Sequence, residues 1–377
     1  MKNDLCKTCH NADMLFKVIA KDKFNLLVNG ITLDAAAETF IGQASLEYAT
    51  SKGIAGGLDL ILPNDVHASV PLSRHYNGKS PYLLTVLNSA LTISRRGEKL
   101  YEVDFIPAPN FLGKLNRDGI PLTNFGNLYT DRLGVSILKG CKYALMRKGC
   151  HFCEISQKKS FSFNSLNGIK ELIDFCEQEQ SINFRHILLT GGCYFSELWD
   201  RYLEMVSGIS AYTKRPIYLM TTPLTNNKLV ALKQAGVSEI GINIELWDRV
   251  IARKMMPAKG LIHKETYMES LKNAVKIFGD SGEVRSLLIV GLEDMHMTLE
   301  AVESLSNMGV MPILSPFRAL RGTELQNYPI PDADFLLETW SESQRICEKN
   351  GLTLGPLCKA CQNNTITIPT SGRYNYY

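Results

Sequence analysis

The sequence lacks the features that mark several large classes of protein. No apolar run reaches the ~18–20 residues of a membrane-spanning helix, and Lys17 interrupts the N-terminal segment before a signal-peptide core can form. Forty-one Lys and Arg against 38 Asp and Glu leave a net charge of +3, too small to indicate a nucleic-acid or membrane partner. No Gly-x-Gly-x-x-Gly follows a predicted strand, which excludes a Rossmann dehydrogenase. We therefore expect a cytoplasmic globular protein.

The length and composition are those of a folded chain with more than one part. Its 377 residues exceed a single small module, and 45% hydrophobic with 21% charged residues is ordinary for a globular protein. We expect either two domains or one large α/β barrel with an extension.

Short apolar runs alternate with longer amphipathic stretches from about residue 130 onward. This alternation predicts a parallel sheet with right-handed helical crossovers. Six strands are fewer than the eight that close a full barrel, so the predicted fold class is α/β, a partial (β/α)6 TIM-like barrel. The predicted strands are Leu133–Leu138, Phe184–Leu189, Ile217–Thr221, Glu239–Ile244, Val284–Val290 and Pro312–Ser315, and the predicted helices are Gly168–Glu179, Glu197–Ser207, Thr225–Ala235, Lys264–Phe278, Thr298–Asn307 and Ala333–Lys349.

The pattern divides the chain into three parts, which are residues 1–130, 131–330 and 331–377. The first part reads as an N-terminal α+β extension that we expect to cap the barrel mouth. The second part is the partial barrel, and the third holds a last helix and a cysteine pair that we expect to join the N-terminal pair. The tyrosines at the end of the chain read as a solvated tail.

Three segments of the extension carry local signals. Thr32–Ser51 reads as one amphipathic helix. Tyr82–Ser94 and Lys99–Ile106 read as two strands of a hairpin that turns at Arg95, Arg96 and Gly97.

Three of the ten cysteines lie together directly after the first predicted strand. Cys141, Cys150 and Cys153 follow the spacing C-x8-C-x2-C, and three thiolates in one loop suit a soft metal centre. A zinc ion would take a fourth ligand such as His151. An iron–sulfur cube would instead leave one iron open to a substrate or cosubstrate. Both centres stay open at this point.

These residues resemble a known family. The cysteine loop from Gly140 to Cys153, the segment Leu189-Thr190-Gly191-Gly192 after the second strand, and the sixfold strand–helix pattern are together similar to the radical S-adenosylmethionine (SAM) superfamily. Members usually space their cysteines C-x3-C-x2-C, so the first gap is longer here. Members often follow the glycine pair with Glu, whereas this chain has Cys193, with Glu197 as a candidate substitute.

The resemblance implies a [4Fe–4S] cluster held by Cys141, Cys150 and Cys153, with SAM on its fourth iron. It implies that the cluster receives an electron from a donor such as flavodoxin or ferredoxin and cleaves SAM to a 5′-deoxyadenosyl radical. That radical would take a hydrogen from a small or carrier-bound substrate. The residues that the resemblance and the strand ends assign to SAM are Phe152, Thr190, Gly191, Gly192, Thr221, Asn243, Glu245, Arg253 and Gly291.

Glu245 raises a question of charge. Strand alternation places Asn243 and Glu245 on one face, toward the barrel interior, and a buried carboxylate needs a cationic partner. The SAM ammonium group and the Arg253 side chain are both candidates for that partner.

Two further cysteine pairs lie near the ends of the chain. Cys6 and Cys9 form one C-x-x-C, and Cys358 and Cys361 form another. Because domain termini are often close in space, we expect the four thiolates to share one metal site. A structural zinc and an auxiliary [4Fe–4S] cluster both satisfy this pattern.

Three alternatives to simple hydrogen abstraction remain. A sulfur-inserting enzyme, similar to lipoyl or biotin synthase, would use a second cluster as its sulfur source. A zinc-binding, non-catalytic protein would use the barrel to bind a ligand. An inactive relative would serve as a scaffold. No residue of the extension indicates the chemical class of the substrate.

Overall fold

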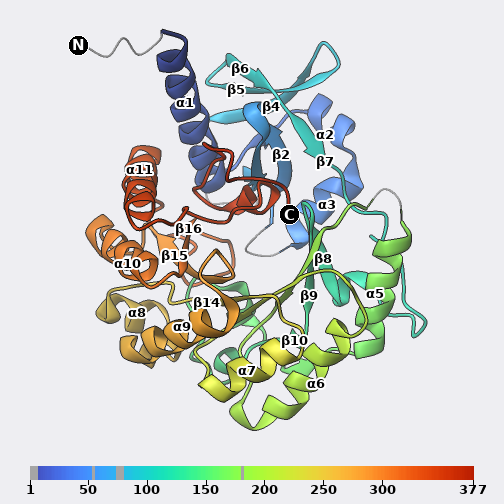
Figure 1. Ribbon diagram of the computed structural model, residues 1–377. Coiled ribbons are helices and arrows are strands. Elements are labelled where there is room, and N and C mark those ends of the chain that lie inside the picture. The colour runs from blue at the N-terminus through green and yellow to red at the C-terminus, as the bar shows by residue number, and fades with distance from the viewer. Residues whose placement is uncertain (1–6, 53–55, 74–79, 180–181) are drawn as a thin grey trace.

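Seven strands form one curled sheet at the centre of the molecule, in the order β16-β15-β14-β13-β12-β9-β8 (Figure 1). The computed structural model describes residues 7–52, 56–73, 80–179 and 182–377, with side chains from Phe16 onward. Six strands are parallel, and β8 pairs with β9 in the antiparallel sense at one edge. The strands are β8 (Gly126–Tyr129), β9 (Arg132–Ser136), β12 (His186–Thr190), β13 (Ile217–Thr221), β14 (Glu239–Ile242), β15 (Val284–Val290) and β16 (Met311–Pro316).

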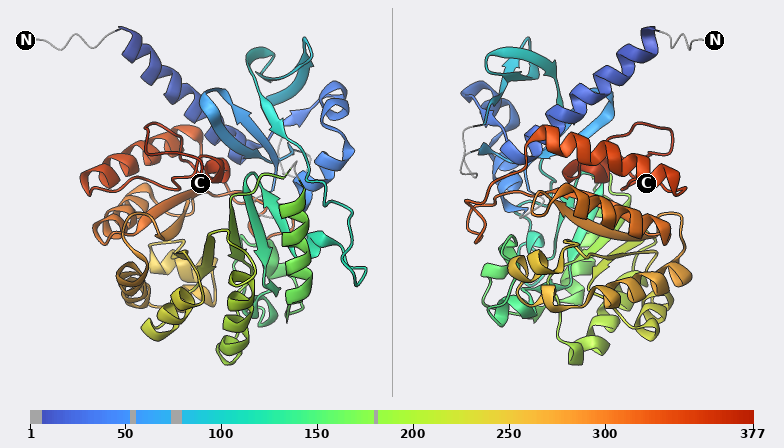
Figure 2. Two further views of the ribbon diagram at one scale, coloured as in Figure 1. Left: turned by 45° about the vertical axis from the view of Figure 1, so that its right-hand side comes forward. Right: turned by 90° about the vertical axis from the view of Figure 1, so that its left-hand side faces the viewer.

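Helices follow the parallel strands and cover the outer face of the sheet (Figure 2). Each buries one apolar stripe, as α5 does with Ile169, Leu172 and Ile173, and its first turn is capped by the Ser165 side chain. The predicted α/β partial barrel is thus confirmed. The covering helices are α5 (Leu166–Gln178), α6 (Trp199–Ser210), α7 (Asn226–Gln234), α8 (Arg249–Met255), α9 (Lys264–Phe278), α10 (Met295–Asn307) and α11 (Ala333–Lys349).

The N-terminal part combines helices with two small sheets. One sheet has the order β1-β4-β5-β6 and the other β3-β2-β7. No helix in the described part of the chain combines the length and the apolar character needed to cross a bilayer. The elements are α1 (Lys7–Asn29), β1 (Thr32–Leu33), α2 (Ala35–Ile41), α3 (Gln43–Ser51), β2 (Leu58–Leu62), β3 (Val66–Val70), β4 (Tyr82–Leu87), β5 (Ala90–Arg95), β6 (Glu98–Glu102) and β7 (Asp104–Ile106).

The extension contacts the open side of the curled sheet, between the edge strands β8 and β16. The Tyr48 hydroxyl accepts the Leu128 backbone N–H of β8 at 2.7 Å. The buried Lys23 ammonium of α1 donates to the carbonyls of Gln362 and Thr367. Ile366 in turn donates its backbone N–H to β16. The short helix η8 (Ala360–Asn364) therefore lies between the extension and the sheet (Figure 1).

Three expectations about the periphery need correction. The predicted helix Thr32–Ser51 is two helices, because Gly42 has φ +80° and ends α2. The predicted strand Tyr82–Ser94 folds back at Asn88 and Ser89 into β4 and β5, although the turn at Arg96 and Gly97 is present. The expected solvated tail is wrong for Tyr374, which is 2% exposed and donates its hydroxyl to the Leu354 carbonyl, whereas Tyr376 and Tyr377 are 39% and 41% exposed.

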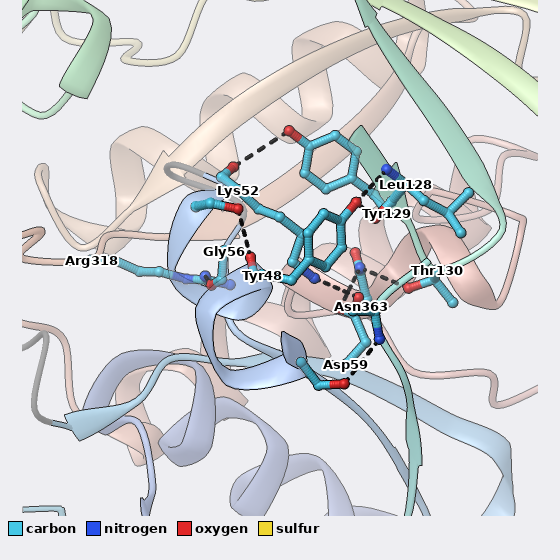
Figure 3. Close-up of polar contacts among 12 residues, drawn as sticks. Tyr48, Lys52, Gly56, Asp59, Leu128, Tyr129, Thr130, Arg318 and Asn363 are labelled. Atoms are coloured by element: carbon cyan, nitrogen blue, oxygen red, sulfur yellow. Dashed lines mark hydrogen bonds and ion pairs between the residues drawn. The ribbon is translucent and has the colours of Figure 1, made fainter. Parts of the chain in front are cut away.

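A buried polar network joins the extension to the barrel and to η8 (Figure 3). The Lys52 ammonium lies 2.6 Å from Asp59, and the Asn363 amide donates to Asp59 and to the Thr130 hydroxyl at 3.4 and 3.0 Å. The side chains of Lys52 and Asp59 are only 2% and 7% exposed. A carboxylate in such a place is costly to bury unless a cationic partner compensates its charge.

Removal of the Lys52 charge tests this network. We expect Lys52→Met to lower the free energy of unfolding by about 3–5 kcal/mol, because it leaves the Asp59 carboxylate buried and unpaired. The matched control is Lys99→Met, which breaks an exposed ion pair with Glu102 and should cost at most about 1 kcal/mol. Urea unfolding of both variants measures the difference, and equal costs would contradict the assigned role.

Candidate functional site

Two loops meet at the carboxyl edge of the sheet. The loop after β9 carries Cys141 in front of the short helix α4 (Lys142–Leu145), and the loop after β12 carries Cys193. The Lys142 N–H donates to the Cys193 carbonyl at 2.8 Å, and the Cys193 N–H donates to the Cys141 sulfur at 3.3 Å. This Cys141–Cys193 contact fixes the position of the first cysteine of the motif.

Two glycines permit this contact. A Cβ on Gly192 would lie less than 3.0 Å from the Gly140 carbonyl oxygen and from two carbon atoms of Cys141. Gly140 has φ +93°, and a Cβ there would overlap the Ser160 carbonyl. Both positions therefore exclude any larger residue. The glycine that the sequence analysis assigned to SAM, Gly192, also holds the cysteine loop in place.

The other two cysteines of the motif lie against an apolar cluster. His151 donates its backbone N–H to the Met255 carbonyl at 2.9 Å, which attaches the loop to the end of α8. Phe152 is 6% exposed and packs within this cluster, and Cys150 and Cys153 contact its edge. The cluster, which we call the apolar roof, consists of Phe152, Leu246, Ala252, Met255, Met256, Ile289, Leu292, Phe317, Ala319 and Leu325.

The thiols differ in their electrostatic surroundings. A hydrogen bond from the Cys193 side chain, and then backbone N–H groups, lower the pKa of Cys141 to about 5. The same hydrogen bond, and then burial, raise the pKa of Cys193. Burial raises the pKa of Cys150 and also that of Cys153, to about 11. The charges of Cys141 and Cys153 also contribute to raising the pKa of Cys150, so the three thiols are electrostatically coupled.

A buried ion pair lies beside these thiols. The Glu245 carboxylate contacts the Lys259 ammonium at 2.8 Å, and Lys259 belongs to the short helix η7 (Lys259–Leu261). Burial opposes the Lys259 charge, but Glu245 together with Tyr267 and the nearby thiols outweighs it, and the pKa of Lys259 is raised. The cation beside Glu245 is therefore Lys259, while Arg253 is exposed on α8. The second Glu245 oxygen, Oε2, is buried without a hydrogen-bond partner in the described chain.

The remaining residues assigned to SAM lie at strand ends with different surroundings. Thr190 and Thr221 end β12 and β13 and are partly buried. The side-chain oxygen of Asn243, Oδ1, accepts a hydrogen bond from the Leu287 backbone N–H, so this side chain joins the end of β14 to β15. Gly291 has φ +103° and a Cβ there would overlap Pro331, which gives this glycine a packing role.

The spacing of the central thiols bears on the metal that they suit. A single tetrahedral zinc with Zn–S bonds of ~2.3 Å holds two thiolates about 3.8 Å apart. In the described residues, Cys141, Cys150 and Cys153 do not form a group with ligand atoms within 4.8 Å of one another. At least one pair of these thiols therefore lies farther apart than two thiolates on a single zinc ion. The Nε2 atom of His151, the candidate fourth ligand, lies 3.3 Å from the exposed Glu324 carboxylate.

The terminal cysteine pairs are described only in part. Cys6 lies outside the described residues, and the structure describes the backbone but not the side chain of Cys9. The start of α1 points away from the body of the molecule (Figure 2). Cys358 and Cys361 are buried at the amino edge of the sheet. Their shared site with Cys6 and Cys9 stays a prediction.

The sequence analysis missed two residues of the site. Cys193 follows the glycine pair directly, so the spacing already placed a fourth thiol near the cysteine loop. Lys259 gave no such signal, because η7 follows no predicted strand and its contact with Glu245 depends on the fold.

Comparisons with known proteins give partial matches. No family model matches the chain. Over 107 residues it is 29% identical to the bacteriochlorophyllide c C-7(1)-hydroxylase of Chlorobaculum limnaeum, a segment of 28% of this chain and 27% of that protein. The matched segment thus spans about a quarter of the relative.

Three solved structures have a similar fold. Methylornithine synthase has a TM-score of 0.45 and 17% identity, over 64% of this chain and 72% of its own. The FeFe-hydrogenase maturase HydG from Carboxydothermus hydrogenoformans has a TM-score of 0.44 and 16% sequence identity, and the match covers 65% of this chain and 62% of that one. Coproporphyrinogen III oxidase from Escherichia coli, a radical SAM enzyme, has a TM-score of 0.39 and 14% sequence identity, and the match covers 54% of this chain and 50% of that one. With TM-scores below 0.5, these likenesses leave the function to be argued from this chain's own residues.

The low pKa of Cys141 predicts its reactivity in protein stripped of metal. A thiol with a pKa of about 5 is already a thiolate at neutral pH, so its alkylation rate should stay level between about pH 6 and 9. Cys153, with a pKa of about 11, should instead react faster as the pH rises over the same range. Mass spectrometry of the labelled peptides separates the two.

The variant Cys193→Ala tests the cause of this shift. It removes the S–H donor to Cys141, so the midpoint of the Cys141 alkylation profile should move to higher pH. If the pKa of Cys141 in the wild-type protein were near the ordinary cysteine value of ~8.5, the Cys141–Cys193 contact would not be formed.

Proposed function

We propose that the protein is a radical SAM enzyme that abstracts a hydrogen atom from a small or carrier-bound substrate. The observation that carries this proposal is the position of three cysteines in the loop after β9, at the carboxyl edge of a partial barrel, with Gly192 packed directly against Cys141. Barrel enzymes place their reactive groups at this edge. The 107-residue match to the hydroxylase supports the proposal without extending its substrate to this chain.

In this proposal Cys141, Cys150 and Cys153 hold a [4Fe–4S] cluster with one iron free of protein ligands. When bound, the reduced cluster supplies the electron that cleaves SAM to methionine and a 5′-deoxyadenosyl radical. The Cys141 sulfur accepts a backbone N–H from the neighbouring loop, and such hydrogen bonds favour its thiolate form. The chain thus presents at least one ligand already charged for metal binding.

Glu245 offers an acceptor for the amino group of SAM. One of its oxygens contacts Lys259, and the other is buried with no partner in the described chain. A buried carboxylate oxygen of this kind is costly unless a donor reaches it. The ammonium group of SAM would be such a donor. Lys259 would then hold Glu245 in position.

The apolar roof excludes water from the same volume. Phe152, Met255 and Phe317 are each at most 6% exposed and pack beside the cysteine loop. A dry site protects a carbon radical from side reactions. Phe152 lies between the two cysteines of the C-x-x-C pair, which supports its assignment to the adenine of SAM. The electron would come from a soluble donor such as flavodoxin or ferredoxin.

The sulfur-inserting alternative depends on what the buried cysteine pair at the other edge binds. A sulfur-inserting enzyme needs a second iron–sulfur cluster. Cys358 and Cys361 contact Asp131 and His186, and among the described residues no further cysteine joins them. The non-catalytic zinc protein remains the alternative of another class, and the iron content of the purified protein separates it from the proposal.

Anaerobic purification and one cysteine variant test the proposal. The protein should be brown, bleach with dithionite and release 5′-deoxyadenosine from SAM. Cys150→Ala should lose the colour and reduce 5′-deoxyadenosine to background, because one cluster ligand is removed. The matched control is Cys176→Ala, which truncates a buried cysteine of α5 and should retain both properties. A colourless protein that contains only zinc, or full 5′-deoxyadenosine production by Cys150→Ala, would contradict the proposal.

A further inference from the structure

A second group of metal-binding side chains lies at the amino edge of the sheet, opposite the cysteine loop. Asp131 immediately precedes β9, and His186 is the first residue of β12. The two strands are parallel and pair Arg132 with His186, which brings Asp131 and His186 to one edge. From His186 to Thr190 the strand rises about 13 Å, so this edge is well separated from the carboxyl edge.

The C-terminal segment adds two thiols to this edge. Cys358 lies 3.5 Å from Oδ2 of Asp131, and Cys361 lies 3.2 Å from Nε2 of His186. The ligand atoms of Asp131, His186 and Cys361 all lie within 4.8 Å of one another. Cys358 is not a member of this group of three, and it adjoins the group through its contact with Asp131. Ligands of one tetrahedral zinc, with bonds of ~2.3 Å to sulfur and ~2.05 Å to nitrogen, are about 3.6 Å apart, close to these distances.

All four groups are removed from solvent. Their exposed fractions are 7% for Asp131, 1% for His186, 7% for Cys358 and 3% for Cys361. The other ring nitrogen of His186, Nδ1, is buried without a hydrogen-bond partner in the described chain. Nothing there fixes the tautomer, so the proton can sit on Nδ1 and leave the Nε2 lone pair directed at the thiol. Four buried polar groups that face one another in this way are stabilised by a shared cation.

The surrounding charges suit an anionic metal complex. Two thiolates, one carboxylate and a divalent ion leave one net negative charge. Three guanidinium groups act on His186, those of Arg132, Arg185 and Arg285. Arg185 lies 3.9 Å from Asp131, whereas Arg285 already has a partner in Glu239 at 2.6 Å. The cationic surroundings would repel a bare cation but stabilise the complex with its three anionic ligands.

We propose that Asp131, His186, Cys358 and Cys361 bind one zinc ion. Two sulfurs, one nitrogen and one oxygen form a donor set that tetrahedral zinc accepts, and three of these atoms lie within 4.8 Å of one another. A [4Fe–4S] cluster would call for four cysteines at wider spacing. This site differs from the four-cysteine site expected from the sequence, because Asp131 and His186 take the places of Cys6 and Cys9.

The zinc has a structural role. It has four protein ligands and no open position, and it lies at the edge of the barrel away from the proposed chemistry. It joins the C-terminal segment to the starts of β9 and β12. The same segment is held by Tyr377, whose ring stacks on His186 at 4.4 Å, and by Asn363, which donates to Thr130 next to Asp131 (Figure 3). Metal binding therefore stabilises the folded chain.

Metal analysis and X-ray absorption of the full-length protein test the proposal. We expect about one zinc per chain, with two sulfur neighbours at ~2.3 Å and two nitrogen or oxygen neighbours at ~2.0–2.2 Å. This measurement needs no variant, so it does not depend on a substituted chain folding. Absence of zinc, four sulfur neighbours, or a disulfide between Cys358 and Cys361 in reduced protein would overturn the proposal.

Variants assign the ligands. His186→Ala and Cys361→Ser should each reduce zinc to a trace and lower the thermal midpoint, and zinc retained at wild-type content would contradict the assignment. The matched control is Cys347→Ser, which changes a fully buried cysteine of α11 outside the ligand group and should keep its zinc. Cys150→Ala should lose iron but keep zinc. That difference separates failure of the zinc proposal from failure of the proposed enzymatic function.

Discussion

The contact between the loops that follow β9 and β12 is the constraint on which the site depends. Two hydrogen bonds join these loops. The Lys142 N–H donates to the Cys193 carbonyl, and the Cys193 N–H donates to the Cys141 sulfur. Such an approach needs glycine at Gly140 and Gly192, because a side chain at either position would overlap the facing backbone. Neighbouring parallel strands supply the two loops at one edge, so the fold and the position of the first thiol are linked.

The two proposed sites lie at opposite edges of the parallel sheet. Its carboxyl edge gathers three thiols, a buried Glu245–Lys259 pair and an apolar roof, as a reactive and dry site requires. Its amino edge gathers Asp131, His186 and the C-terminal cysteine pair, as a closed structural metal site requires. The extension and η8 cover the open side of the sheet, where they contact β8 and β16 (Figure 1).

Local patterns predicted the barrel well because each strand–helix unit buries its own apolar stripe. Ile217–Thr221, Val284–Val290 and Ala333–Lys349 have the predicted bounds. The extension was harder, since Gly42 breaks one apparent helix by its backbone conformation alone. Asp131 and His186 were not found, because they are 227 and 175 residues from Cys358 and Cys361, and their pairing depends on strand register. The sequence analysis noted Cys193 only as a departure from the family motif, although its position directly after Gly191 and Gly192 already indicated that it lies near the cysteine loop.

The central claim is that Cys141, Cys150 and Cys153 surround one iron–sulfur cluster at the carboxyl edge of the sheet. Anomalous diffraction at the iron absorption edge, from a crystal grown without oxygen, tests it most directly. The account predicts one strong iron peak bounded by these three sulfurs, beside the Gly191–Gly192 backbone and the free oxygen of Glu245. An iron peak elsewhere, or the three thiols without iron in a protein that still cleaves SAM, would contradict it.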